Sequence, residues 1–158
     1  MTNVIDKKFE VRWDDIDSGG QLRTTRYLEY ASYARISYFQ DAGFPRSRMN
    51  QMGLGMVVLA EDAEYRDEVF LAESVTVRAR VVGLSADGTR WQVAHTFLHS
   101  GGKIAAILYT LGGWLDVTAR KLTAPPPELK SVMDAVRSKD CEVINAEWRP
   151  GTPGAGGW

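Results

Sequence analysis

Apolar and charged residues alternate along residues 8–13, where Phe9, Val11 and Trp13 are each separated by a charged side chain. A repeat of two residues is typical of a strand with one buried face. The alternation stops at Asp17-Ser18-Gly19-Gly20, where the glycines favour a turn. The pattern therefore predicts an opening strand that leads into an acidic, glycine-rich turn.

The repeat changes to three and four residues between Thr24 and Gly43, which is the spacing of an amphipathic helix. Thr24 or Thr25 can serve as the N-cap, and Gly43 before Phe44 is a suitable helix end. This segment predicts a helix of about five turns. A shorter helical turn is expected in residues 46–52.

Four segments rich in β-branched and aromatic residues come next, and they span residues 56–67, 74–84, 89–99 and 103–117. Glycine-containing turns at residues 86–88 and 100–102 separate the last three, which predicts an antiparallel meander. After the prolines at 125–127, helical spacing returns over residues 128–138. The Gly- and Pro-rich residues 149–158 show no periodicity and are expected to form a mobile tail.

The order of these elements predicts the fold class. The one long helix must bury its apolar face against the strands, because no second long helix is available to receive it. A chain of 158 residues with 44% apolar residues is the size of one domain. We expect an α+β fold in which an antiparallel sheet of about five strands wraps around a long central helix. Residues 1–140 would form this single domain and residues 141–158 a C-terminal extension.

Charge and cysteine content exclude several classes of function. The 19 basic and 20 acidic residues nearly cancel, which argues against binding to nucleic acid or to an anionic membrane. Cys141 is the only cysteine, so one chain can form neither a disulfide nor a Cys/His zinc cluster. His95 and His99 lie about 13 Å apart on one strand, which is too far for a shared metal. No segment is apolar over the about 20 residues that a membrane-spanning helix needs.

The N-terminal residues 1–10 lack the apolar stretch of a signal peptide. We therefore expect a cytoplasmic protein without metal or redox cofactor.

Asp17 is the most informative candidate for chemistry. It lies in the turn that immediately precedes the long helix, whose first amides are free and carry the positive end of the helix dipole. Such amides stabilise negative charge on a carbonyl oxygen, so an acid facing them suits attack on a carbonyl. An aspartate in a turn more often serves only as a local cap, and this alternative stays open.

The stretch Arg12-Trp13-Asp14-Asp15-Ile16-Asp17-Ser18-Gly19-Gly20, followed by Tyr27 and Tyr30, resembles the opening of the hotdog-fold thioesterases of the 4-hydroxybenzoyl-CoA thioesterase family. The resemblance extends from Phe9 to Val136. It implies that Asp17 is the catalytic carboxylate, acting as a nucleophile or as a general base, and that the backbone amide near Thr24 polarises the thioester. The implied reaction is hydrolysis of an acyl-CoA to a free acid and CoA.

The chain differs from this family directly after the turn. Many relatives have Gly-His and asparagine there, whereas this chain has Gln21, which can hydrogen-bond but cannot take up a proton. Arg23 and Arg26 either receive an acidic acyl tail or a CoA phosphate, or pair with the neighbouring Asp14 and Asp15. A catalytically silent hotdog protein that binds an acyl-CoA or another small ligand is the alternative function.

Further candidates complete the predicted site. The neighbouring carboxylates of the turn would raise one another's pKa, which suits a general base. The family has basic residues that contact CoA phosphates, and they lie about where this chain has Arg90. The free edges of a five-stranded sheet favour a homodimer or a homotetramer. The predicted substrate-binding residues are Gln21, Arg23, Thr25, Tyr27, Glu61 and Arg90.

Overall fold

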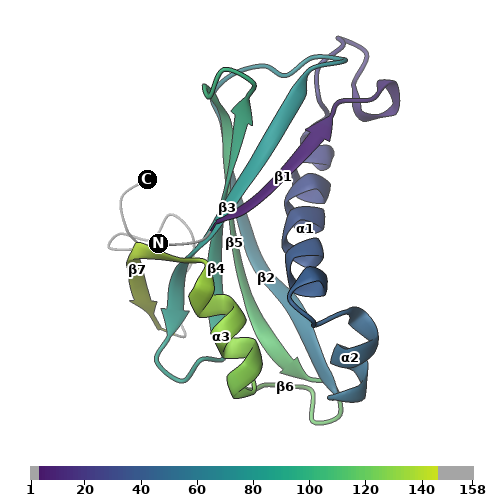
Figure 1. Cartoon of the computed structure of the whole chain (residues 1–158). Coiled ribbons are helices and arrows are strands. Elements are labelled where there is room, and N and C mark those ends of the chain that lie inside the picture. Colours follow the sequence, from purple (N-terminus) through teal and green to yellow (C-terminus); the bar gives the residue numbers. More distant parts are fainter. Residues whose placement is uncertain (1–3, 146–158) are drawn as a thin grey trace.

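The structure is a computed structural model that describes residues 4–145. Its elements in chain order are β1 (Ile5–Glu10), a short 3₁₀ turn (Trp13–Asp15), α1 (Thr24–Asp41), α2 (Arg46–Gln51), β2 (Leu54–Tyr65), β3 (Ser74–Ser85), β4 (Arg90–His99), β5 (Ile104–Asp116), β6 (Lys121–Leu122), α3 (Pro127–Ala135) and β7 (Arg137–Ile144). The sheet has the order β1-β3-β4-β5-β2, with β6 paired to β5 and β7 to β3. Figure 1 shows α1 running alongside the curved sheet. The expected α+β architecture is confirmed.

The predicted meander corresponds to β3, β4 and β5, which are joined by tight turns. Gly88 and Gly102 adopt φ values of 75° and 88° in these turns, where a side chain would be strained. In contrast, β2 does not lie beside β3, which follows it in the sequence, but at the far edge beside β5. β2 is therefore an edge strand of the sheet.

Packing of α1 against the sheet depends on small side chains on the buried face of the helix. Ala31 and Ala34 are completely buried, which allows the helix backbone to approach the strands closely. Tyr27 and Phe39 fill the space at the two ends of the helix, and Phe97 lies beneath Tyr27 with the ring centroids 5.0 Å apart. The inner face of the sheet and this helix face form one continuous apolar core.

Three predicted boundaries are wrong. The opening strand ends at Glu10, and Trp13 is 78% exposed rather than buried, because the Asp15 carboxylate accepts the Arg12 amide and turns the chain into the 3₁₀ turn. The N-cap of α1 is Arg23, whose side chain makes no capping bond, and not Thr24 or Thr25.

The third error lies near the C-terminus. The helix predicted for residues 128–138 ends at Ala135, because the next residues form β7 and pair in parallel with β3. This strand crosses the predicted boundary between residues 140 and 141, while the division into domain and extension stays a prediction. The expected mobile tail at 149–158 lies outside the described residues.

Among residues 4–145, no helix combines the length and the apolar character needed to cross a membrane. In the same part of the chain, no three His, Cys, Asp or Glu side chains come together as metal ligands would.

A charged residue lies in the core. Arg35 of α1 is only 3% exposed, and its Nη1 lies 3.2 Å from Nε2 of the fully buried His95 on β4. The His95 Nδ1 lies 3.2 Å from the carbonyl oxygen of Leu108. A neutral imidazole fits both contacts, since it donates from Nδ1–H to the carbonyl and accepts the Arg35 N–H at Nε2. Burial, together with the charge of Arg35, lowers the pKa of His95 to about 3.

We expect this histidine to make the fold sensitive to acid. The ordinary pKa is 6.5, so the unfolded chain binds a proton below that pH, whereas the folded protein does so only near pH 3. The stability is therefore complete above pH 6.5 and is lost as the pH falls towards 3. Between about pH 7 and about pH 4.5, His95 alone should lower the free energy of unfolding by roughly 2.5 kcal/mol.

Urea unfolding of the wild type and of His95→Gln at both pH values measures this contribution. Glutamine does not titrate, yet its amide keeps one donor and one acceptor for Leu108 and Arg35. The variant should lose distinctly less stability on acidification. An identical pH dependence in both proteins would contradict the assignment of a buried neutral imidazole.

Candidate active site

Asp17 closes the glycine-rich turn and still exposes part of its carboxylate. Its backbone amide donates to the carbonyl oxygen of Gln21 at 2.8 Å, and its Oδ1 accepts the amides of Gly19 at 2.8 Å and Gln21 at 3.1 Å. Gly20 has a φ of 82°, a conformation that other residues rarely adopt. The second oxygen, Oδ2, accepts no hydrogen bond from the described residues 4–145. Asp17 is thus a turn cap with one oxygen left for chemistry.

The start of α1 provides a free amide close to this turn. The Arg23 amide donates to the carbonyl oxygen of Asp15 at 2.9 Å, and the Arg26 amide donates to Arg23. Thr24 is the first residue of the helix, and its amide has no acceptor within the part of the chain that the structure describes. Unpaired amides at a helix start can stabilise a developing oxyanion. The geometry is compatible with the role expected for Thr24.

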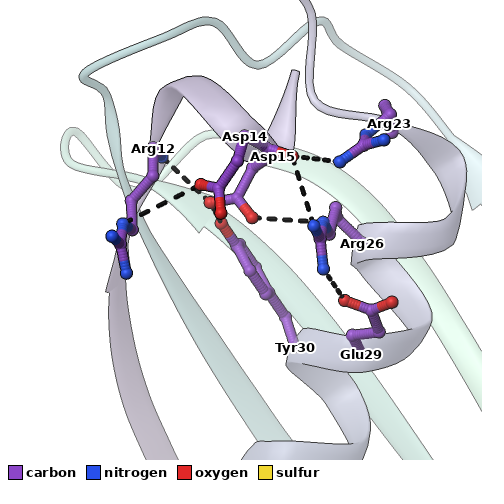
Figure 2. Close-up of polar contacts among 7 residues, drawn as sticks. All are labelled: Arg12, Asp14, Asp15, Arg23, Arg26, Glu29 and Tyr30. Carbon is purple, nitrogen blue, oxygen red and sulfur yellow. Dashed lines mark hydrogen bonds and ion pairs between the residues drawn. The ribbon is translucent and has the colours of Figure 1, made fainter. Parts of the chain in front are cut away.

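A buried carboxylate, Asp15, joins the turn to α1 (Figure 2). Its Oδ2 accepts the Tyr30 hydroxyl at 2.7 Å and the Arg12 amide at 2.9 Å, while its Oδ1 lies 3.2 Å from Nε of Arg26. Burial alone would raise the pKa of Asp15, but the hydrogen bonds from Tyr30 and Arg12 and the charge of Arg26 outweigh it, and the pKa is lowered. The expected mutual increase in carboxylate pKa is therefore wrong for Asp15.

The two arginines at the start of α1, Arg23 and Arg26, have partners within the chain. Arg26 pairs with Asp15 and with Glu29, and its Nη2 donates to the Asp14 carbonyl oxygen at 3.2 Å. Arg23 also donates to this backbone carbonyl and does not contact the Asp14 carboxylate. Of the two readings of these arginines, pairing with the acidic turn applies to Arg26, which is consequently occupied. Its pKa is raised, chiefly by the hydrogen bond to Glu29.

A cavity of about 280 Å³ opens next to the helix start, between α1 and the C-terminal end of β2. Three of the predicted residues, Gln21, Thr24 and Tyr27, line this cavity. The Tyr27 ring packs edge-on against Tyr65 with centroids 5.1 Å apart, and its burial raises the pKa of Tyr27 to about 12. The Gln21 side chain donates to Oε1 of Glu68 at 2.7 Å. The cavity is therefore an aromatic recess with a free amide and carboxylates at its rim.

Residues 11–133, which include this turn, the helix and the cavity, match the protein family described as the thioesterase-like superfamily. The chain belongs to the thioesterase-like superfamily. A protein of Aquifex aeolicus (strain VF5) with the name "Putative esterase" is 31% identical over 75 residues, which cover 48% of this chain and 59% of that protein. The match thus spans less than two thirds of the length of this curated relative.

Solved structures share the fold of this superfamily member. A Staphylococcus aureus protein in complex with CoA has a TM-score of 0.79 and 15% identity, covering 95% of this chain and 92% of that one. A 1,4-dihydroxy-2-naphthoyl-CoA thioesterase from Synechocystis has a TM-score of 0.75 and 12% identity, covering 83% and 96%. Similarity at these identities confirms the hotdog fold. Membership of the narrower 4-hydroxybenzoyl-CoA thioesterase family stays a prediction.

The other predicted residues of this thioesterase-like protein lie outside the cavity. Arg23, the N-cap, and Thr25 are exposed at the start of α1, and Glu61 lies midway along the edge strand β2. Arg90 pairs with Gly113, which in turn pairs with Val57 at the start of β2, so Arg90 lies at the opposite end of the sheet from Thr24. Within one chain, the structure does not bring Glu61 or Arg90 to the turn.

Two carboxylates at the cavity are absent from the sequence-based site. Asp67 and Glu68 lie in the connection after β2 and line the recess beside Thr24. Asp67 also pairs with Lys103 at 2.8 Å and lies 3.0 Å from Nε2 of His99, and its pKa is lowered chiefly by the bond to Lys103. Forty-seven residues separate Gln21 from Glu68, so no local pattern could have indicated their contact.

Proposed function

We propose that this protein is a thioesterase that hydrolyses an acyl-CoA to the free acid and CoA. The observation that carries the proposal is that Gln21, whose amide donates to Oδ1 of Asp17, and Thr24, whose amide is free, line one recess. The amide would hold the thioester oxygen while negative charge develops on it. Membership of the thioesterase-like superfamily supports the same reaction class.

Two forms of the reaction are compatible with this arrangement. As a general base, Asp17 would accept a proton from water while the water oxygen bonds to the acyl carbon, the C–S bond breaks, and the CoA sulfur leaves and takes up a proton. As a nucleophile, an Asp17 oxygen would itself bond to the acyl carbon and expel CoA, and water would then hydrolyse the mixed anhydride. Both forms use Oδ2, the carboxylate oxygen that the turn leaves free.

Thiol release from a panel of short, long, branched, charged and aromatic acyl-CoAs tests the proposal. We expect saturable release with at least one of them, without added metal or cofactor. The occupation of Oδ1 by two backbone amides also fits a protein that uses Asp17 only to shape the turn. Saturable binding of acyl-CoAs in calorimetry without any thiol release would favour that silent alternative and contradict hydrolysis.

The assembly is proposed to be a homodimer or a homotetramer. The outer edge of β2 pairs with no strand of the described residues, and Val58 and Leu59 on it are exposed. An unpaired apolar edge of this length is normally covered, which a second copy could do. Sedimentation equilibrium measures the mass directly, and a monomer at micromolar concentration would contradict this assembly.

A further inference from the structure

A second cavity of about 520 Å³ lies between α1, α2 and the first half of β2. Among the described residues, its wall contains two arginines, Arg35 and Arg46, and no aspartate or glutamate. Ile36 and Val58 on this wall are 56% and 47% exposed in the single chain, and the proposed second copy at the β2 edge would cover Val58. Most other wall residues are apolar, including Phe39, Phe44, Met49, Leu54 and Met56. The cavity is therefore apolar and positively charged.

Arg35 has no counter-ion in the described part of the chain. No carboxylate of residues 4–145 forms an ion pair with it, its Nε is buried without a hydrogen-bond partner, and its Nη1 faces the neutral His95. Glu61 is near enough to favour the charged form of Arg35, but Glu61 is exposed and forms no ion pair with the guanidinium. Burial lowers the pKa of Arg35 to about 10, so the side chain stays cationic at neutral pH. A buried charge without a partner is costly, which points to a ligand.

Other unpaired polar groups lie on the same side of α1. The Trp91 ring centre is 5.5 Å from the Arg35 guanidinium carbon, and the Trp91 Nε1 is buried without an acceptor. The hydroxyl of the fully buried Thr110 also has no partner among the described residues. Thr110 pairs with Val93, two residues from His95, so it shares the inner sheet face with His95. Buried polar groups normally have a hydrogen-bond partner, and the side chains of Arg35, Trp91 and Thr110 lack an oxygen that accepts their hydrogen bonds.

We propose that Arg35 binds a carboxylate at the far end of the acyl group, so that the preferred substrates are ω-carboxyacyl-CoA thioesters. This inference rests on the proposed function and names its substrate class. Both cavities are walled by α1 and β2, with Thr24 and Tyr65 at one end and Arg35 and Leu54 at the other. The helical rise separates Thr24 from Arg35 by about 16 Å. An extended acyl chain of about 14 carbons would span this distance from a thioester held at Thr24.

The apolar wall residues and the guanidinium have complementary roles in this arrangement. Methylene groups of the acyl chain would pack against Ile36 and Phe39, while the terminal carboxylate would pair with the Arg35 guanidinium. Arg46, at the first turn of α2, adds a second positive charge to the wall. Charge-assisted bonds to a planar guanidinium are strong and directional.

Matched substrate pairs test the proposal. We compare dodecanedioyl-CoA with dodecanoyl-CoA and tetradecanedioyl-CoA with tetradecanoyl-CoA, since the members of each pair differ only at the chain end. The wild type should have the higher kcat/KM for the carboxylated member of each pair. In Arg35→Met, the ratio of the two kcat/KM values should fall roughly 10- to 100-fold, the effect of losing a hydrogen bond to a charged group. Arg35→Lys keeps the charge without the planar fork and should give an intermediate ratio.

Calorimetric binding of free suberate separates this inference from the proposed hydrolysis. Suberate binding to the wild type and not to Arg35→Met, without thiol release, would support the anion site and overturn hydrolysis. Thiol release with an unchanged ratio and no suberate binding would overturn the anion site and leave hydrolysis standing.

The thermal unfolding midpoint and the mass of the assembly distinguish a ligand site at Arg35 from a purely structural role of this residue. Because Arg35→Met removes an unneutralised buried charge, its unfolding midpoint should not fall. A lower midpoint with an unchanged ratio would show that Arg35 serves the fold and would overturn the proposal. Dissociation of the Arg35→Met assembly would show that a carboxylate of a second copy neutralises Arg35, which would overturn it as well.

Discussion

Replacement of Asp17 by asparagine should lower the kcat of thiol release at least about a hundredfold. Asparagine can neither accept the proton of an attacking water nor attack the thioester itself, so it removes both forms of the chemistry assigned to Asp17. Its side-chain oxygen can still accept the amides of Gly19 and Gln21, so the turn keeps its shape. The loss should therefore appear in kcat, with little change in KM and in the thermal midpoint.

Asp14→Asn is the matched control for Asp17→Asn. Asp14 is an exposed carboxylate in the same segment, and its side chain lies 3.9 Å from Arg12 in an exposed ion pair. Such pairs contribute little, so the control should retain wild-type thiol release. Wild-type rates in Asp17→Asn would show that another carboxylate, such as Glu68 at the rim of the recess, activates the water.

A single-turnover reaction in oxygen-18 water separates the two roles of Asp17. A nucleophilic carboxylate passes through a mixed anhydride, whose hydrolysis can leave the heavy isotope on the Asp17 side chain. A general base places the isotope only in the released acid. Mass spectrometry of the peptide that contains Asp17 reads out the difference.

Asp15→Ala should lower the free energy of unfolding by roughly 1.5–3 kcal/mol, the cost of removing the charged acceptor of hydrogen bonds from Tyr30 and Arg12. The change leaves the Tyr30 hydroxyl and the Arg12 amide without an acceptor and the Arg26 charge without its buried partner. Because the pKa of Asp15 is lowered from 3.8, its contribution is complete above pH 3.8 and is lost as the pH falls through the folded-state pKa. Urea unfolding near neutral pH measures the full effect.

Asp14→Ala is the control for stability, as the backbone carbonyl of residue 14 still accepts Arg23 and Arg26. It should cost less than about 1 kcal/mol. Equal losses in the two alanine variants would contradict the description of Asp15 as the buried link between the turn and α1. Tyr30→Phe should reproduce part of the Asp15→Ala loss, since it removes only the hydroxyl bond.

Much of the fold can be predicted because its signals are local. The three- and four-residue repeat from Thr24 to Gly43 indicates α1, and the glycines at 88 and 102 mark the two hairpins that the structure contains. The position of β2 beside β5 is not encoded in any such window. Periodicity reports which face of a strand is buried, but not which strand lies next to it.

The candidate site likewise combines features that the sequence predicts with contacts that only the structure shows. The sequence by itself determined the acidic glycine turn with Asp17 and the helix start at Thr24, because turn and helix propensities act over a few residues. Only the tertiary structure decided that Asp15, and not its neighbour Asp14, is buried against Tyr30. It alone brought Glu68 to Gln21 and buried Arg35 beside His95 without a counter-ion among residues 4–145. These contacts join residues far apart in the chain, so their energies depend on how the sheet closes over the helix.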